Sequence, residues 1–224
     1  MKFSATCAAL LLAIALVPFA SAEDAAKEAA PKPGKKGWYK LFNGKDLTGW
    51  KVTEENPETF KVEDGQIVAH GNVAHLFYDG PVENHDFKNF IWKCELMTKP
   101  KANSGMYFHT KYQPTGWPAV GIETQVNNTH DDPRKTGSLY RIKDIMNDAP
   151  AKDNEWFTQT VKVKDGHVTV KVNGKVVNEW EQPEDFKREE GWEKNVVSSG
   201  TFCLQGHDPG SEVRYRKVMV KPLK

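Results

Sequence analysis

Three features of the sequence predict an all-β protein, built as an antiparallel two-sheet sandwich. Apolar and polar residues alternate along most of the chain after residue 37, and short runs of this kind are separated by Gly, Pro and Asn. No stretch repeats apolar residues at helical spacing over three turns; only residues 183–194 have the composition of a short helix. Because each sheet then has one apolar face, two sheets packed on these faces give the simplest core.

The N-terminus has the layout of a secretory signal peptide. Lys2 precedes the apolar run CAALLLAIALVPFA, and the small residues ASA at positions 20–22 provide a cleavage site. We therefore expect residues 1–22 to be removed, a mature chain that starts at Glu23, and a periplasmic or secreted protein. The apolar run is short for a bilayer and no stop-transfer pattern follows it, so no membrane span is expected.

The segment 23–37, EDAAKEAAPKPGKKG, is rich in Ala, Pro and charge and has little to bury, which predicts a disordered linker. Aromatic residues then recur to the end of the chain without a second break in composition. We therefore expect one domain over residues 38–224, a length that suits a single sandwich.

Charge and cysteine content exclude some classes of protein. The chain has 31 basic and 30 acidic residues, and loss of Lys2 with the signal peptide leaves 30 of each, interspersed along the sequence. Nucleic-acid binding usually needs a basic stripe, so no nucleic-acid partner is expected. Cys94 and Cys203 allow one disulfide after export, but two buried free thiols are an equal alternative. Nothing in the sequence indicates an oligomeric state.

Two regions show the strand pattern most clearly. In FIWKCEL, residues 90–96, the apolar side chains of Phe90, Trp92, Cys94 and Leu96 fall on one face. Residues 160–177, TVKVKDGHVTVKVNGKVV, contain alternating valines interrupted by a KDG turn and by the NG pair that tight hairpins prefer. These are successive antiparallel strands, in which we expect Val163 and Val170 to be buried.

Polar residues share one face of another predicted strand, GIETQVNN. Ile122, Thr124 and Val126 point to one side, and Glu123, Gln125 and Asn127 to the other. A solvated outer face and a binding surface explain this pattern equally well.

The C-terminal region has the same property. Phe202 and Leu204 point inward, while Gln205 and His207 fall on the opposite face before DPG interrupts the strand. In EVRYRKVMV the parity of the apolar residues changes, which predicts a β-bulge near residues 216–217. For His207 taken alone, a surface or turn histidine is the commoner interpretation.

Other candidate sites have weaker patterns. The residues His109, His130, His207 and Glu123 offer metal-binding groups, but their spacings match no short ligand motif. We therefore predict no cofactor and no metal site, although a divalent cation is conceivable. Four aromatic residues are able to stack on sugar rings or to fill a core: Tyr107, Trp117, Tyr140 and Trp156.

Taken together, the blocks of sequence resemble the 3-keto-disaccharide hydrolase family. They are, in order, GWYKLFNGKDLTGWKV, NFIWKCELMTKPKANSGMYFHT, VGIETQVNN, KTGSLYRI, NEWFTQTVKVKDGHVTVKVNGKVV and LQGHDPGSEVRYRKVMVKPL. The resemblance covers nearly the whole mature chain. It implies a jelly-roll sandwich of the concanavalin A-like lectin/glucanase type and an oxidised glycan or glycoside, with a 3-keto group, as substrate.

The resemblance also implies the site. The positions that match the family pattern assign catalytic roles to Glu123, His207 and Arg216, with Glu123 or His207 as the general base. The resemblance also implies Gln125 and Gln205 in substrate binding, together with His109, which stands where the family often has Arg. From the aromatic residues above we add Tyr140 and Trp156 as substrate-binding candidates, because their rings are able to stack on a sugar. A base, a hydrogen-bonding or cationic electrophile and a 3-ketone together allow β-elimination of the glycosidic oxygen, followed by hydration.

Two alternatives remain open. A non-catalytic carbohydrate-binding module of lectin type has the same expected fold, since jelly-roll sandwiches serve both purposes. A conventional glycosidase needs two carboxyl groups, and Gln125 occupies the place two residues after Glu123 where a second acid would be expected. The second alternative is therefore disfavoured by the sequence.

Overall fold

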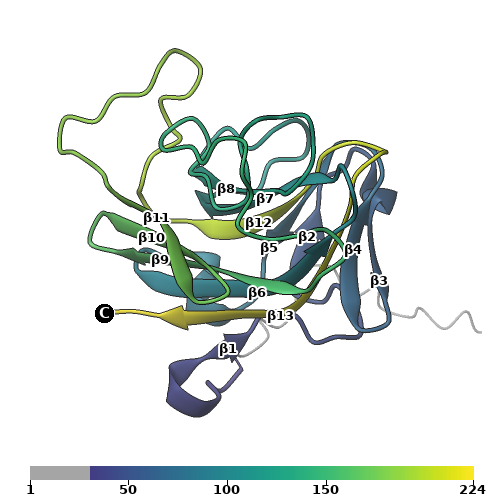
Figure 1. Cartoon of the computed structure of the whole chain (residues 1–224). Helices are drawn as coiled ribbons and strands as arrows, with labels where there is room; N and C mark the ends of the chain where they lie inside the picture. The colour runs from purple at the N-terminus through teal and green to yellow at the C-terminus, as the bar shows by residue number, and fades with distance from the viewer. Residues whose placement is uncertain (1–30) are drawn as a thin grey trace, which may run out of the picture.

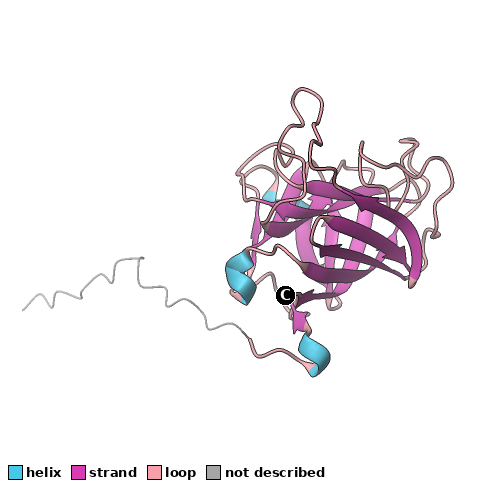
Figure 2. Cartoon of the chain, turned by 90° about the vertical axis from the view of Figure 1, so that its left-hand side faces the viewer, coloured by secondary structure: helices cyan, strands magenta, loops and turns pink. Residues whose placement is uncertain are grey.

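Two antiparallel β-sheets packed face to face make up residues 31–224, the part of the chain described by the computed structural model (Figure 1). Figure 2, in the perpendicular view, shows the strands as two curved layers with the longer loops gathered beyond one of them. The predicted signal peptide, residues 1–22, and the first part of the predicted linker lie outside the described residues. The all-β prediction is confirmed, because residues 31–224 contain strands, three 3₁₀ turns and no α-helix.

The larger sheet has eight strands. Seven follow one another in space in the order β11 (Lys175–Glu181), β10 (His167–Val172), β9 (Phe157–Lys164), β6 (Phe90–Thr98), β13 (Glu212–Pro222), β4 (Gln66–His70) and β3 (Phe60–Glu63). The eighth, β1 (Tyr39–Lys40), pairs with β13 beside this path.

The smaller sheet has five strands, in the order β2 (Trp50–Val52), β5 (Ala74–Tyr78), β12 (Thr201–Gly206), β7 (Asn103–Thr110) and β8 (Ile122–Asn127). The 3₁₀ turns are η1 (Lys35–Gly37), η2 (Pro57–Thr59) and η3 (Val82–His85). Loops that follow β7, β8 and β11 lie beyond β7, β8 and β12 in Figure 1.

The core lies between the sheets and matches the alternation in the sequence. Burial alternates along β6: the side chains of Phe90, Trp92, Cys94 and Leu96 are buried between the two sheets, and the residues between them are only partly buried. Trp92 of the larger sheet stacks on Phe202 of the smaller one, with ring centroids 4.4 Å apart. Val163, Val170 and Leu204 are also fully buried, as predicted. Each such side chain contributes about 1.5–3 kcal/mol through the apolar area that it removes from water.

The turns and the bulge also follow the sequence. Asp165-Gly166 and Asn173-Gly174 each have two positive φ angles, as tight two-residue hairpins require. The pairing of β13 with β6 shifts between Arg216 and Met219, and Lys217 has a φ of 49°. The predicted β-bulge is therefore confirmed.

Two details settle or correct expectations. Residues 183–194, which have the composition of a short helix, form turns within the β11–β12 loop instead, because no periodic apolar face holds a helix there. Cys94 and Cys203 are buried and unpaired; they lie on different sheets. No helix within residues 31–224 is long and apolar enough to cross a membrane.

Candidate functional site

A pocket of about 290 Å³ lies on the outer face of the smaller sheet, under the loops. Strands β7, β8 and β12 supply its floor, and the loops that follow β7, β8, β11 and β12 supply its walls. The residues that line it are Asn103, Tyr107, Trp117, Pro118, Glu123, Gln125, Asp132, Tyr140, Trp192, Gln205 and His207.

Strand register explains why polar side chains meet on this floor. Tyr107 of β7 pairs with Glu123 of β8, and its other neighbour across the sheet is Cys203 of β12. Two residues further along β12, Gln205 therefore points to the same face. The residues next to these positions along the strands, such as Leu204 and Ile122, point into the core. The alternation predicted for both strands is confirmed, but the polar face is covered by loops rather than exposed.

Glu123 is the centre of a buried hydrogen-bond network, with 9 % of the residue exposed. The hydroxyl of Tyr107 donates to Glu123 Oε2 at 2.9 Å. The amide Nε2 of Gln205 lies 3.2 Å from Glu123 Oε1 and 2.9 Å from the Tyr107 oxygen. The surroundings of Gln125 favour the orientation in which its nitrogen donates to Glu123 Oε1 at 2.9 Å. The carboxyl group is therefore held in one position.

Gly105 makes room for this carboxyl group. It faces Gln125 across the β7–β8 ladder, and a Cβ at this position would overlap Glu123 Oε1 and lie 2.8 Å from its Cδ. The glycine of the NSG block is thus required by the Glu123 side chain rather than by a turn.

Burial raises the pKa of Glu123 from 4.5 to about 8. The hydrogen bonds from Tyr107 and Gln205 act in the opposite direction, and the negative charge of Asp132 adds to the increase. Burial therefore favours the neutral form of Glu123 at pH 7, in which the carboxyl group is able to donate a proton. Burial likewise raises the pKa of Tyr107 well above 10, so this hydroxyl stays neutral.

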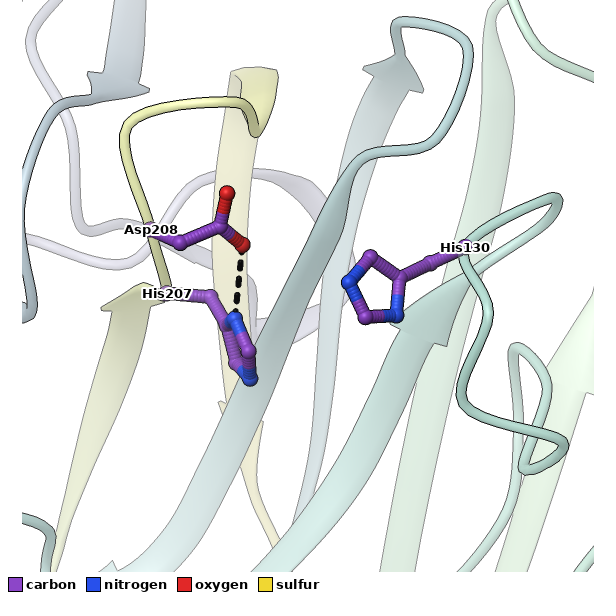
Figure 3. Close-up of side chains that lie close together, drawn as sticks. All are labelled: His130, His207 and Asp208. Carbon is purple, nitrogen blue, oxygen red and sulfur yellow. Dashed lines mark hydrogen bonds and ion pairs between the residues drawn. The ribbon is translucent and has the colours of Figure 1, made fainter.

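His207 lies at the rim of the same pocket, in the turn between β12 and β13. Its Nδ1 is 2.7 Å from Asp208 Oδ2, an interaction drawn in Figure 3. The ring lies 5.4 Å from Trp117 and 5.5 Å from His130, measured between ring centroids. Trp117 is 47 % exposed, although it is a large apolar side chain. The rim therefore combines an imidazole with an accessible aromatic surface.

His130, His207 and Asp208 are the one group of metal-type ligands found in residues 31–224, with ligand atoms within 4.8 Å of one another (Figure 3). The hydrogen bonds of His130 fit a metal site poorly. The amide N–H of Asp132 donates to His130 Nδ1 at 3.0 Å, so the proton of the neutral ring is on Nε2. A metal-bound histidine normally has the reverse arrangement, with Nδ1 as a donor. The prediction of no cofactor stays a prediction.

An aromatic wall closes another part of the pocket. Tyr140 and Trp192 stack with ring centroids 6.0 Å apart, and both come from loops. The hydroxyl of Tyr140 is 3.4 Å from Asp132 Oδ2, and Asp132 Oδ1 lies 3.6 Å from the guanidinium of Arg134. Flat aromatic faces beside carboxyl and amide groups are suited to a sugar ring, which has apolar faces and polar edges.

The model of the family described as the 3-keto-alpha-glucoside-1,2-lyase-like domain matches residues 37–221. The chain belongs to this family. No curated protein matches. A protein of Parabacteroides distasonis named as a candidate glycosyl hydrolase is 27 % identical, with a TM-score of 0.71 over 84 % of this chain and 94 % of that one. The predicted family is therefore confirmed.

More distant structures support the jelly-roll fold alone. An endo-β-1,3(4)-glucanase is 14 % identical, with a TM-score of 0.56 over 86 % of this chain and 98 % of that one. A carbohydrate-binding module of Bacillus subtilis is 12 % identical, with a TM-score of 0.52 over 77 % and 95 % of the two chains. The 3-keto-glucoside lyase-like domain thus has the same fold as both a glycan-cleaving enzyme and a binding module.

The structure brings together five of the eight site residues that the sequence suggested: Glu123, Gln125, Tyr140, Gln205 and His207 all line the pocket. The remaining three lie elsewhere. Arg216 is in the larger sheet, where its guanidinium pairs with Glu95 at 2.7 Å and covers the ring of Trp156. The alternation in the sequence correctly placed Arg216 on the outward face of β13, but this strand belongs to the larger sheet, whereas the pocket lies on the smaller one.

His109 is likewise not in the pocket lining. It is buried at the end of β7, where Nε2 is 3.0 Å from the carbonyl oxygen of Lys88 and Nδ1 accepts the amide N–H of Ser198. Its φ of 56° breaks the alternation of the strand. Burial lowers its pKa to about 4. These contacts describe a neutral histidine that joins two loops.

Several pocket residues were not identified from the sequence. Tyr107 was considered only as a stacking aromatic, although it alternates with Gly105 and Asn103 on β7 and this pattern was available. Asp132 and Trp192 come from long loops, where no periodicity indicates direction. Only the three-dimensional structure places them beside Glu123.

Proposed function

We propose that this protein cleaves the glycosidic bond of 3-keto-glycosides by removal of the C2 proton, elimination of the C1 oxygen and addition of water. The membership of the family and the resemblance of Glu123, Gln205 and His207 to its site support the substrate class. The observation that carries the proposal is a pocket in which a buried, protonated carboxyl group and a histidine meet.

The chemistry requires two proton-transfer groups of opposite character. A ketone at C3 acidifies the hydrogen at C2, so that a base removes it while the electron pair moves toward the ketone oxygen. The resulting enolate expels the C1 oxygen, which leaves with a proton from an acid. Water then adds across the double bond to give net hydrolysis. Two titratable groups in contrasting environments supply such a pair.

The surroundings of Glu123 and His207 support one assignment of the two roles. Glu123 keeps its proton at pH 7, which suits it to donate to the ketone oxygen or to the leaving oxygen. His207, with Nδ1 directed at Asp208, has Nε2 available as the base. Since Arg216 lies on the other sheet, negative charge on the substrate is stabilised by an uncharged donor such as the Asn103 amide.

Incubation of the mature protein with a 3-keto-glucoside and with its unoxidised parent tests this function. We expect release of the aglycone from the ketone alone. Glu123→Gln and His207→Gln should each reduce kcat by roughly 10²–10⁴, the usual contribution of a positioned acid or base. Glu181→Gln and His167→Gln, on the larger sheet, are the matched controls and should keep the parental rate. Binding of the sugar without cleavage would contradict the proposal and favour a binding module.

A second candidate function rests on Asp132. Its carboxylate, paired with Arg134, lines the same pocket as Glu123, so the second acid that strand β8 lacks is supplied by a loop. Conventional glycoside hydrolysis uses two carboxyl groups, one of which donates a proton. Cleavage of the unoxidised parent, abolished by Asp132→Asn, would support this function; cleavage of the ketone alone would exclude it.

We also propose that the protein is exported and acts in the periplasm or outside the cell. The charged start, short apolar run and ASA site support this location. Mass spectrometry of the exported protein should give a mature N-terminus at or near Glu23. An exported protein that retains Met1 would contradict cleavage.

A further inference from the structure

We propose that Asp208 is a positioning residue that holds His207 in the tautomer with Nδ1 protonated and Nε2 free to act as the base. The inference rests on the proposed function for its catalytic consequence, but the tautomer itself is a property of the resting protein. It adds a residue to the machinery of the site that the sequence did not indicate.

The carboxylate of Asp208 is fixed by three donors. The amide N–H of Gly210 donates to Oδ1 at 2.8 Å, and the hydroxyl of Ser211 donates to Oδ2 at 2.7 Å. His207 Nδ1 is the third, also at 2.7 Å from Oδ2. The DPGS turn that interrupts the strand pattern thus serves to hold one acid in place.

These hydrogen bonds also keep Asp208 charged. Partial burial alone would raise its pKa, but the bonds from Ser211, His207 and Gly210 outweigh this effect and lower the pKa below 3.8. A charged carboxylate accepts only, so the proton in the bond to His207 belongs to the imidazole Nδ1. In the neutral ring the lone pair is then on Nε2.

The turn is connected to the pocket floor. Besides donating to Asp208, the hydroxyl of Ser211 accepts the amide N–H of Asn103 at 2.8 Å. Asn103 begins β7 and lines the pocket. A continuous series of hydrogen bonds therefore links the position of the His207 ring to the strand that contains Tyr107. This connection fits a positioning role better than a chance surface contact.

Neighbouring groups leave Asp208 as the anion nearest to the ring. The rings of Trp117 and His130 flank His207, and His130 presents Nε2–H in its neutral form. His75, buried on β5, has no hydrogen-bond partner for either nitrogen within residues 31–224. Burial, together with the nearby His207, lowers its pKa to about 3, so it stays neutral.

The tautomer is tested on the unmodified protein by ¹⁵N NMR of the histidine side chains at a pH where His207 is neutral. We expect a protonated Nδ1 and an unprotonated Nε2 for His207, assigned by the loss of its signals in His207→Gln. Asp208→Asn should change the tautomer populations. A resting His207 with its proton on Nε2 would overturn the inference whether or not the protein is an enzyme.

The catalytic consequence is tested with the 3-keto-glucoside after treatment with a chelator. Asp208→Asn should lower kcat by roughly 10²–10⁴, as in other sites where an acid orients a histidine, and should change the pH profile while KM changes little. Asp185→Asn, in the exposed β11–β12 loop, is the control. The parental kcat in a folded Asp208→Asn variant would overturn the inference. A requirement for an added divalent cation would do so too, because a cation on His207 takes the lone pair.

Discussion

Strands β12 and β13 follow one another in the sequence, yet they belong to different sheets and hold polar side chains in opposite surroundings. Gln205 of β12 is 2 % exposed and bonds to Tyr107 and Glu123 under the loops. Arg216 of β13 has 37 % of its side chain exposed and pairs with Glu95. Both residues lie opposite the apolar face of their strands, as the alternation predicted.

The difference shows how much structural information the alternation of apolar and polar residues along a strand contains. Alternation gives the face of a strand, inward or outward, but not the sheet to which the strand belongs. The outer face of the smaller sheet is covered by loops, so its polar groups are desolvated and the pKa of Glu123 rises to about 8. The outer face of the larger sheet around Glu95 is open to solvent, and its polar groups form ordinary ion pairs.

The largest effect of a substitution on kcat and stability is expected at Gly105, on the loop-covered outer face of the smaller sheet. Gly105→Ala places a Cβ against the carboxyl group of Glu123, which must leave its bonds with Tyr107 and Gln205. We expect kcat to fall at least about 100-fold, since a small misplacement of a reacting group has this consequence. Crowding of a well-packed site should also cost about 1–3 kcal/mol of stability, measured by urea unfolding.

A double-mutant cycle separates this contact from a general effect on β7. In a Glu123→Ala background the added methyl group no longer meets a carboxyl group, so Gly105→Ala should then cost much less stability. Equal costs in both backgrounds would show that Glu123 is not the residue that requires the glycine.

The covered face also predicts a pH dependence of stability. The pKa of Glu123 is raised from 4.5 to about 8, so between these values the folded chain binds more protons than the unfolded chain. The free energy of unfolding should therefore decrease as the pH rises through this window. Glu123→Gln removes the contribution, and the variant should gain roughly 2–5 kcal/mol relative to the parent between pH 4 and pH 9. Parallel curves for the two proteins would show that Glu123 is not desolvated.

Much of the fold was predictable because it depends on local patterns. Alternation along residues 90–96 and 160–177, the Asn173-Gly174 turn and the parity change near Arg216 each report geometry within a few residues. The buried core positions and the bulge followed from them. On the floor of the pocket, the same reasoning placed Glu123 and Gln205 on polar faces.

The rest of the site depends on contacts between distant segments. Asp132 and Trp192 lie in loops without a periodic pattern, and both contact Tyr140, which comes from a loop as well. From the sequence, Asp208 is only the first residue of the DPG turn that interrupts the strand. An Asp that starts a turn and an Asp that orients a histidine look the same in a sequence. The pKa of Glu123 likewise depends on loops that cover it, a property that β8 alone does not contain.

The smallest effect of a substitution is expected on the solvent-exposed outer face of the larger sheet, at Arg216. Arg216→Ala removes the ion pair with Glu95 and the contact of the guanidinium with Trp156, 3.9 Å from the ring centroid. A partly exposed pair and a cation–π contact together should account for about 0.5–1.5 kcal/mol of stability, seen in urea unfolding. The rate of cleavage should stay within about twofold of the parent, because the residue lies on the other sheet. Arg214→Ala, which loses the pair with Glu212 on the same strand, is the matched control and should behave alike. A folded Arg216→Ala variant with kcat reduced tenfold or more, beside an unaffected Arg214→Ala, would mean that β13 contributes to the site and that the two faces are not functionally separate.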